Sequence, residues 1–275
     1  MSMTVRTNIA AMQASGQLGR TQKNLSRTLG RISSGLRITQ AADDAAGLGV
    51  ATALETSVIS TRQAMRNAND GISIIQTAES ATNEVTDILQ RMRELAIQSA
   101  SDTLANDERS YIQDEFLQLR QEVERIAAVT EFNGVSLTDG SSSSIDVQVG
   151  IQNSSNSLIT ITLGDLTTGA GLGIDTITLL SSTGARSALD FLDTALSSVN
   201  STRSQFGAVQ NRLESALNNS QVYSEALSAA ESQIRDADFA VETSELTKLQ
   251  IMQQAGVAAL AQAKNINQSV ISLLS

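Results

Sequence analysis

The chain has 275 residues, of which 41% are hydrophobic and only 3% aromatic, and it contains no Pro, Cys, His or Trp. Disulfides are therefore excluded, as are serine–histidine and cysteine–histidine catalysis and the usual zinc sites, which leaves carboxylate chemistry as the only enzymatic option. The formal net charge is −10, yet residues 1–42 contain six Lys and Arg residues and no acid.

The composition favours long helices that pack on one another. Proline usually makes up about 5% of a chain, and it interrupts a helix more strongly than any other residue. Its complete absence here is typical of uninterrupted helices. A core of Ala, Leu, Ile and Val with few aromatic side chains also suits helix-on-helix packing.

Apolar residues recur every seven positions at the start of the chain, as in an amphipathic helix. One such row holds Ala11, Leu18, Leu25 and Ile32. The segment Ser33-Ser34-Gly35 interrupts the repeat and predicts a bend. We expect the helix to resume near Ala45.

Two further helices are predicted over residues 45–100 and 106–130. The first carries paired rows of a coiled-coil seam, with Ile74, Ala81, Ile88 and Leu95 beside Ala78, Val85 and Met92. The second has apolar residues at alternating spacings of four and three, from Ile112 to Ile126. Asn106 is the expected N-cap of this helix, and Asn133-Gly134 is expected to stop it.

The middle of the chain changes from a helical to a strand-like period. Ile145, Val147 and Val149 alternate with polar residues, as do Ile159 and Ile161. The polar loop 152–157 joins the two runs, which predicts a β-hairpin followed by Gly- and Thr-rich turns to about residue 184.

The last third is predicted to be helical again, over residues 186–234 and then to the end of the chain. From Leu249 to Ser275 the only charged side chain is Lys264, so this last helix has few charges to hold it in water. We therefore expect it to be buried in an assembly. The whole pattern predicts a mainly α fold, a long antiparallel coiled-coil rod with a small β-hairpin at its tip, in which the first helix faces the last.

Several long motifs closely resemble bacterial flagellin, in a short form that lacks the variable outer domains. The N-terminal side reads LSRTLGRISSGLRITQAADDAAGLGVATALE at residues 25–55, RNANDGISIIQTAE at 66–79, LQRMRELAIQSA at 89–100 and TEFNGVSL at 130–137. The C-terminal side reads RDADFAVETSELTKLQIMQQAGVAALAQA at residues 235–263. The resemblance covers about residues 1–140 and 185–275, in the order found in the family.

The resemblance implies three parts. Residues 1–33 and 238–275 are similar to the inner-tube coiled coil of a filament. Residues 34–44 and 235–237 are similar to the spoke linkers, and residues 45–234 to the rod domain, with its β region at about 131–184. Because no outer domain follows the hairpin, a thin and smooth filament is expected.

The implied function is a structural, non-enzymatic subunit that polymerises with itself into the extracellular flagellar filament used for swimming. The implied partners are the export apparatus, a secretion chaperone, the filament cap and the hook-junction proteins, and no cofactor is expected. Polymerisation stripes are expected at Leu18, Leu25, Ile32, Leu249, Met252, Ile266, Val270 and Leu273.

The resemblance also implies recognition by the vertebrate flagellin-sensing Toll-like receptor. Family members that this receptor recognises share an Arg and Leu pair with a downstream Glu, which here correspond to Arg91, Leu95 and Glu115. A structural alternative stays open, because Leu95 lies in the predicted seam and Arg91 with Glu115 could form an ordinary solvated pair.

Two positions depart from the family pattern. Ala42 stands where Lys is common before the Asp43-Asp44 pair, and Asn267 stands where Pro is usual. Adjacent carboxylates can bind a hard cation, but without further oxygen ligands we interpret the Asp pair as a helix N-terminal charge or a subunit contact.

Other classes of protein fit less well. The hook–filament junction protein usually has a proline after the paired Asp, whereas Ala45-Ala46-Gly47 follows here. A non-flagellar coiled-coil signalling or scaffold protein would have a membrane span or form a stable dimer. No stretch reaches about 20 apolar residues, and no long uninterrupted seam runs to either terminus. Aromatic residues do not interleave the basic ones, so nucleic-acid binding is not expected. The Arg- and Ser-rich, acid-poor N-terminus could be an organellar transit peptide, but its apolar repeat runs on without a cleavage-like break.

Overall fold

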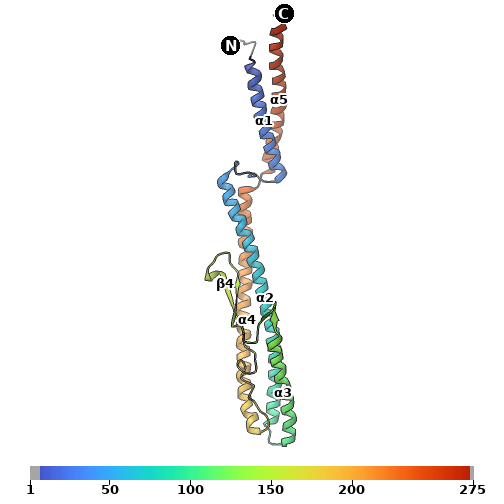
Figure 1. Ribbon diagram of the computed structural model, residues 1–275, viewed down its shortest axis with the longest axis vertical. Helices are drawn as coiled ribbons and strands as arrows, with labels where there is room; N and C mark the ends of the chain where they lie inside the picture. The colour runs from blue at the N-terminus through green and yellow to red at the C-terminus, as the bar shows by residue number, and fades with distance from the viewer. Residues whose placement is uncertain (1–6, 273–275) are drawn as a thin grey trace. The chain divides into compact units, whose positions relative to one another are not determined.

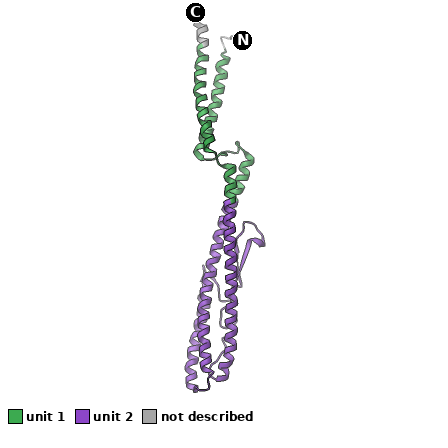
Figure 2. Ribbon diagram, turned by 180° about the vertical axis from the view of Figure 1, so that it is seen from behind, with its two compact units in different colours: residues 1–56, 226–275 green, residues 57–225 purple. Residues whose placement is uncertain are grey.

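The computed structural model describes residues 7–272, and the side chains of residues 7–265. The mainly α fold with a small β-hairpin is confirmed (Figure 1). The chain divides into two compact units, coloured separately in Figure 2. The terminal unit comprises residues 1–56 and 226–275, and the central unit comprises residues 57–225. These boundaries fall inside two long helices, α2 (Ala45–Ser99) and α4 (Ser182–Arg235).

The terminal unit is built around an antiparallel pair of helices, α1 (Ile9–Ser34) and α5 (Phe239–Ser272), which lie side by side in both views (Figures 1 and 2). The Asn8 side chain caps α1 by accepting a hydrogen bond from the Ala11 amide at 2.9 Å. Gly35 ends the helix at φ 72°, a conformation that glycine adopts without steric cost. The bend predicted at Ser33-Ser34-Gly35 is therefore confirmed.

The central unit contains a three-helix bundle in which α3 (Asn106–Val129) packs with parts of α2 and α4. The predicted seam of α2 forms its core: Val85, Met92 and Leu95 are at most 2% exposed. Phe116 from α3 and Leu192 from α4 are completely buried in the same cluster. The heptad rows therefore mark the buried faces of these helices.

The start of α3 differs from the prediction. Ala105, not Asn106, occupies the N-cap position, and Asn106 is the first helical residue. The Ala105 side chain can accept no hydrogen bond, but the Glu108 carboxylate accepts one from the Ala105 amide at 2.9 Å. Glu108 reaches back in this way because its carboxylate is favoured in the positive first turn of the helix.

A second, very short hairpin follows α3, where the sequence predicted only a helix stop. Strands β1 (Glu131–Phe132) and β2 (Val135–Ser136) pair antiparallel around Asn133-Gly134. Asn133 has φ 50° and Gly134 has φ 78°. Positive φ at both central residues defines a type I′ turn, for which Asn-Gly is the preferred sequence.

The predicted β-hairpin is confirmed as β3 (Ser144–Gln148) paired with β4 (Leu158–Thr162), and the short 3-10 turn η1 (Ser155–Ser157) precedes β4. Its position differs from the prediction, because the hairpin lies against the middle of α2 and α4 and not at their tip. Its inner face packs on α2 and α4 in a second core cluster that includes Val147 and Ile161. Gly71 of α2 permits this contact, because a Cβ atom there would lie 3.0 Å from Val147 Cγ2.

The segment between β4 and α4 has no regular structure, yet it contributes to the core of the bundle. Its side chains buried in the bundle core are Leu166, Leu172, Ile174, Ile177 and Leu179. Polar contacts hold its end: the Ser99 hydroxyl donates to the Leu179 carbonyl at 2.6 Å, and the Leu179 amide donates to Gln113 Oε1 at 2.5 Å. This stretch was predicted as turns because it has no hydrophobic period.

Within residues 7–272, no helix combines the length and the hydropathy that crossing a membrane requires.

Candidate assembly and recognition surfaces

Large apolar side chains are exposed on both helices of the terminal pair. On α1 these are Ile9, Met12 and Leu29; on α5 they are Phe239, Val241, Ile251, Met252 and Val257. Their exposed fractions run from 40% for Met252 to 69% for Met12. Single exposed apolar residues are ordinary, but such a group on one helix pair marks an interaction surface.

The exposed apolar side chains of α5 point in several directions. At about 100° per residue, Phe239 and Val257 lie to one side of the buried Leu249. Val241 and Met252 lie to its other side, and Ile251 lies opposite it. A helix that is apolar on all sides is normally buried. A single partner helix therefore cannot cover α5.

The face that α5 shows to α1 is already buried within the chain. Leu249 is 3% exposed and Leu25 is 7% exposed. Leu18 packs close to Gly256, where a Cβ atom would lie 3.3 Å from Leu18 Cδ1. Gln253 Nε2 also donates to Gln22 Oε1 at 2.6 Å.

The predicted polymerisation stripes consequently separate into two groups. Leu18, Leu25 and Leu249 belong to the seam between α1 and α5, and Ile32 is half-buried, whereas Met252 is exposed. Leu273 lies outside the described residues, as do the side chains of Ile266 and Val270.

A cluster of charges, here called the ionic clasp, joins α1, the α1–α2 linker and α5. It comprises Arg27, Arg31, Asp43 and Glu242. Arg31 Nη2 and Arg27 Nε each lie 3.7 Å from Asp43 Oδ1. Arg31 Nη1 lies 3.3 Å from Glu242 Oε1. The carboxylates are well covered, with side chains 6% exposed at Asp43 and 11% at Glu242.

Asp43 is further held by its own linker. Its Oδ2 atom accepts hydrogen bonds from the Thr39 amide, the Thr39 hydroxyl and the Gln40 amide, at 3.1 to 3.3 Å. Burial acts to raise the pKa of Asp43. The hydrogen bonds from Thr39 and Gln40, together with the Arg31 charge, outweigh burial and leave this pKa below its ordinary value.

Asp44 has a separate, local role. Its Oδ1 atom accepts a hydrogen bond from the Gly47 amide at 2.8 Å in the first turn of α2. This agrees with the interpretation of the Asp pair as a helix N-terminal charge. Asp43, in contrast, serves the ionic clasp.

The ionic clasp was missed at the level of sequence. Residues 1–42 contain no acid, so the sequence offers no carboxylate within this stretch to pair with its basic residues. Instead, Arg27 and Arg31 find their carboxylates within the same chain. The available signal was Asp43, the first acid in the sequence, which lies in the linker after a helix with basic residues in its last two turns.

Two of the three predicted receptor residues lie together on the surface of the central unit. Arg91 Nη2 donates to Glu115 Oε1 at 2.8 Å, and Arg91 Nη1 donates to Glu94 Oε2 at 2.8 Å. Hydrogen bonds to Glu115 and Glu94 raise the pKa of Arg91. Leu95 is only 2% exposed and belongs to the bundle core.

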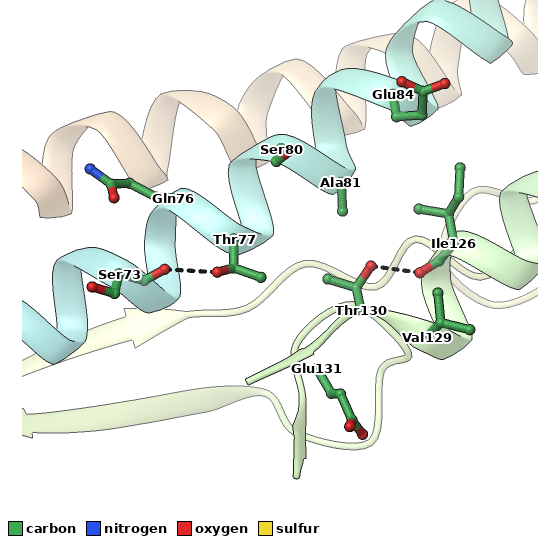
Figure 3. A pocket seen from close by; sticks show the side chains of 10 residues that line it. All are labelled: Ser73, Gln76, Thr77, Ser80, Ala81, Glu84, Ile126, Val129, Thr130 and Glu131. Carbon is green, nitrogen blue, oxygen red and sulfur yellow. Dashed lines mark hydrogen bonds between the residues drawn. The ribbon is translucent and has the colours of Figure 1, made fainter. Parts of the chain in front are cut away.

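A shallow pocket of about 700 Å³ lies between α2 and the end of α3 (Figure 3). Its hydroxyls already serve their own helices, because Thr77 donates to the Ser73 carbonyl and Thr130 to the Ile126 carbonyl. Glu84 and Glu131 are its only titratable residues. In the described part of the chain, no group of three or more acidic side chains is placed to hold a metal ion.

A helical scaffold with a group of exposed apolar side chains on its terminal helix pair is typical of a structural subunit that assembles with other chains. Family models agree with this class. The bacterial flagellin N-terminal helical region matches residues 5–143, and the C-terminal helical region matches residues 189–274.

Curated relatives match over their whole length. Flagellin from Halalkalibacterium halodurans is 42% identical over 273 residues, covering 99% of this chain and 100% of the relative. The flagellar filament 33 kDa core protein of Treponema phagedenis is 38% identical over 288 residues, with the same coverage.

One solved flagellin structure agrees with these relatives, and a second solved structure shares the fold. Bacillus cereus flagellin is 32% identical, with a TM-score of 0.50, over 56% of this chain and 88% of that one. A putative flagellar hook-associated protein from Vibrio parahaemolyticus has a TM-score of 0.60 over 70% of this chain and 100% of that one, but at 14% identity it shows only the fold.

The chain belongs to the bacterial flagellin family. It is a structural subunit that polymerises with itself into the flagellar filament, and it is not an enzyme. The hook–filament junction alternative is not favoured.

Proposed function

We propose that the chain is secreted through the flagellar export apparatus and folds into the extracellular filament by burying the exposed apolar side chains of α1 and α5 between copies. The observation that carries this proposal is the distribution of apolar residues around α5. Since α1 covers only the side of α5 that carries Leu249, at least two further sides of α5 are free to contact neighbouring copies of the chain.

Burial of these side chains supplies the driving force for assembly. Transfer of apolar surface out of water contributes roughly 25 cal/mol per Å², and Phe239, Val241 and Val257 are each more than half exposed. In this proposal residues 1–33 and 238–275 form the inner-tube layer. Residues 34–44 and 235–237 are the spokes, and residues 45–234 form the surrounding rod domain.

Truncation tests the proposal. Removal of residues 249–275 deletes most of α5 but leaves the central unit intact. We expect a protein that keeps the circular-dichroism signal of a folded bundle and forms no filaments in electron microscopy. Filaments from the truncated protein would contradict the proposal.

A finer test changes only the surface. Ile251→Gln combined with Val257→Gln removes two apolar contacts on different sides of α5 and leaves the Leu249 seam in place. We expect at least a tenfold rise in the critical concentration for polymerisation, measured by sedimentation. Gln254→Ala, at an exposed polar position of the same helix, is the matched control and should polymerise normally.

We also propose that the Arg91–Glu115 pair forms part of a surface recognised by the vertebrate flagellin-sensing Toll-like receptor. Arg91 and Glu115 are about half exposed, so both are available to a partner. Because Leu95 is buried, its part in this proposal is to position the helix beneath Arg91.

Substitution of Arg91 by Ala tests this recognition. A receptor reporter assay on purified monomer should show at least a tenfold loss of potency, with the helical content unchanged. Arg125→Ala is the matched control, since Arg125 forms a similar exposed pair with Glu122. Equal receptor signals from wild type and Arg91→Ala would contradict the assignment of Arg91 to the recognised surface.

The proposed set of partners also includes the export apparatus, a secretion chaperone, the filament cap and the hook-junction proteins. These partners are proposed because the chain belongs to the flagellin family. The hairpin β3–β4 is followed by only a short irregular segment before α4, which supports a smooth filament without an outer domain.

A further inference from the structure

The methionines of this chain lie in very different environments. Met12 on α1 is 69% exposed and Met252 on α5 is 40% exposed. Met92, in contrast, is completely buried in the bundle core, and Met65 on α2 is half-buried. Met1 and Met3 lie outside the described residues. The two strongly exposed thioethers are thus both on the terminal helix pair.

Both side chains belong to the apolar surface that assembly would bury. Met12 lines a shallow groove of about 490 Å³ with the N-cap residue Asn8, with Ala11 of α1 and with Leu260 and Lys264 of α5. Met252 lies on the same side of α5 as Val241, beside the seam that Leu249 makes with α1. A chemical change at either sulfur therefore alters the contact surface without touching the core.

We propose that Met12 and Met252 are reversible oxidation sites, and that their conversion to sulfoxides prevents a free subunit from adding to a filament. This inference rests on the proposed role of the α1 and α5 surface in assembly. Oxidation would then control assembly through this surface. Met12 and Met252 would be open to oxidants in free subunits and protected from them in assembled filaments.

The reaction needs a peroxide as oxidant. The sulfur lone pair attacks one oxygen of hydrogen peroxide and forms an S–O bond, while the O–O bond breaks. The other oxygen leaves as hydroxide and takes the proton of the transferred hydroxyl, so that one molecule of water is released. Methionine loses two electrons and the peroxide gains them. The product is a polar sulfoxide in place of a flexible apolar side chain.

The physical consequence follows from burial. A sulfoxide oxygen that enters an apolar contact without a hydrogen-bond donor loses its water partners and gains nothing in exchange. On the exposed surface of the free subunit it keeps its water, so the fold of the subunit is unaffected. The modification therefore penalises assembly and not folding.

The test treats free full-length subunits with hydrogen peroxide, quenches the reaction and measures the critical concentration for polymerisation. Peptide mass spectrometry follows each methionine separately. We expect Met12 and Met252 to oxidise at least tenfold faster than Met92. We also expect the critical concentration to rise about tenfold, which corresponds to about 1.4 kcal/mol.

Three comparisons make this test specific. The double variant Met12→Leu and Met252→Leu should polymerise after peroxide treatment, whereas the control Met65→Leu should be inhibited like wild type. Methionine sulfoxide reductases of both epimer specificities should restore polymerisation of the wild-type protein. In preformed filaments, both sites should oxidise at least tenfold more slowly than in free subunits.

Inhibition of the double variant as strong as that of wild type would overturn the proposal, because it would place the effect on another methionine. Unchanged polymerisation after full oxidation of Met12 and Met252 would also overturn it. Failure of the untreated protein to form filaments is a different result, which would count against the proposed function itself.

Discussion

At the scale of single residues, the ionic clasp shows how four charged side chains connect segments far apart in sequence. Arg31 lies between Asp43 of the linker and Glu242 of α5 and contacts both. The Arg31 Nε atom is buried with no hydrogen-bond partner among the described residues. The guanidinium group of Arg31 therefore depends on its two ion pairs, which Nη1 and Nη2 form. Covered charges of this kind depend strongly on their partners.

Replacement of Asp43 by Asn should therefore loosen the clasp. An Asn side chain can still accept hydrogen bonds from the Thr39 and Gln40 amides, but it offers no charge to Arg27 and Arg31. We expect faster amide hydrogen exchange in the last turns of α1 and no change in the central unit. Thr39→Ala, which removes one hydroxyl bond and leaves the charge, should have the smaller effect.

The same carboxylate predicts a pH dependence. Because the pKa of Asp43 is lower in the folded than in the unfolded chain, its stabilising contribution is complete above the unfolded value of about 3.9. The contribution is lost as the pH falls through the lower, folded value. In an acid titration between pH 6 and 2, Asp43→Asn should lose less stability than wild type. An identical loss of stability in the two proteins between pH 6 and 2 would contradict this role of Asp43.

At the scale of elements, the close contact between α2 and the β3–β4 hairpin depends on Gly71. Substitution by Leu would place a side chain against Val147 and Leu213, both within 3.3 Å of the position of a Cβ atom. Overpacking of this kind costs typically 1–3 kcal/mol. We expect a loss of this size in denaturant unfolding. Gly207→Leu, where nothing lies within 4 Å, should be neutral or stabilising by up to about 1 kcal/mol.

The elements also show which patterns carry structural information in the sequence. Helical apolar repeats predicted α1, α2 and α3, and alternation predicted β3 and β4, because each period reflects one face turned inward. The segment between β4 and α4 buries Leu166 and Ile174 without any period. Its conformation depends on the shape of the bundle that it covers, so local pattern could not reveal it.

At the scale of the whole molecule, the excess negative charge lies entirely in the central unit. Residues 57–225 contain 21 Asp and Glu residues against 10 Lys and Arg residues, whereas the terminal segments contain 8 against 9. In the proposed filament, where residues 45–234 surround the inner tube, neighbouring copies bring together like-charged central units. Salt screens this repulsion, with a Debye length of about 10 Å at 0.1 M.

Polymerisation should consequently be favoured by salt. Raising NaCl from 10 to about 150 mM should lower the critical concentration several-fold, since the apolar contacts of the terminal helices are not weakened by screening. A variant with Glu84→Gln and Asp87→Asn should show a smaller salt effect. A critical concentration that rises with salt would instead indicate that attraction between opposite charges dominates assembly.

The sequence by itself determined the helical and strand segments, the turn at Gly35 and the resemblance to flagellin, because these depend on local period and on motifs. It marked Leu25 and Met252 as one kind of apolar residue. Only the tertiary structure decided that Leu25 lies in the seam and Met252 on the surface, and that Arg31 meets Glu242. The physical reason is that such contacts depend on how each helix is rotated about its axis against a partner more than 200 residues away, and no local pattern records that rotation.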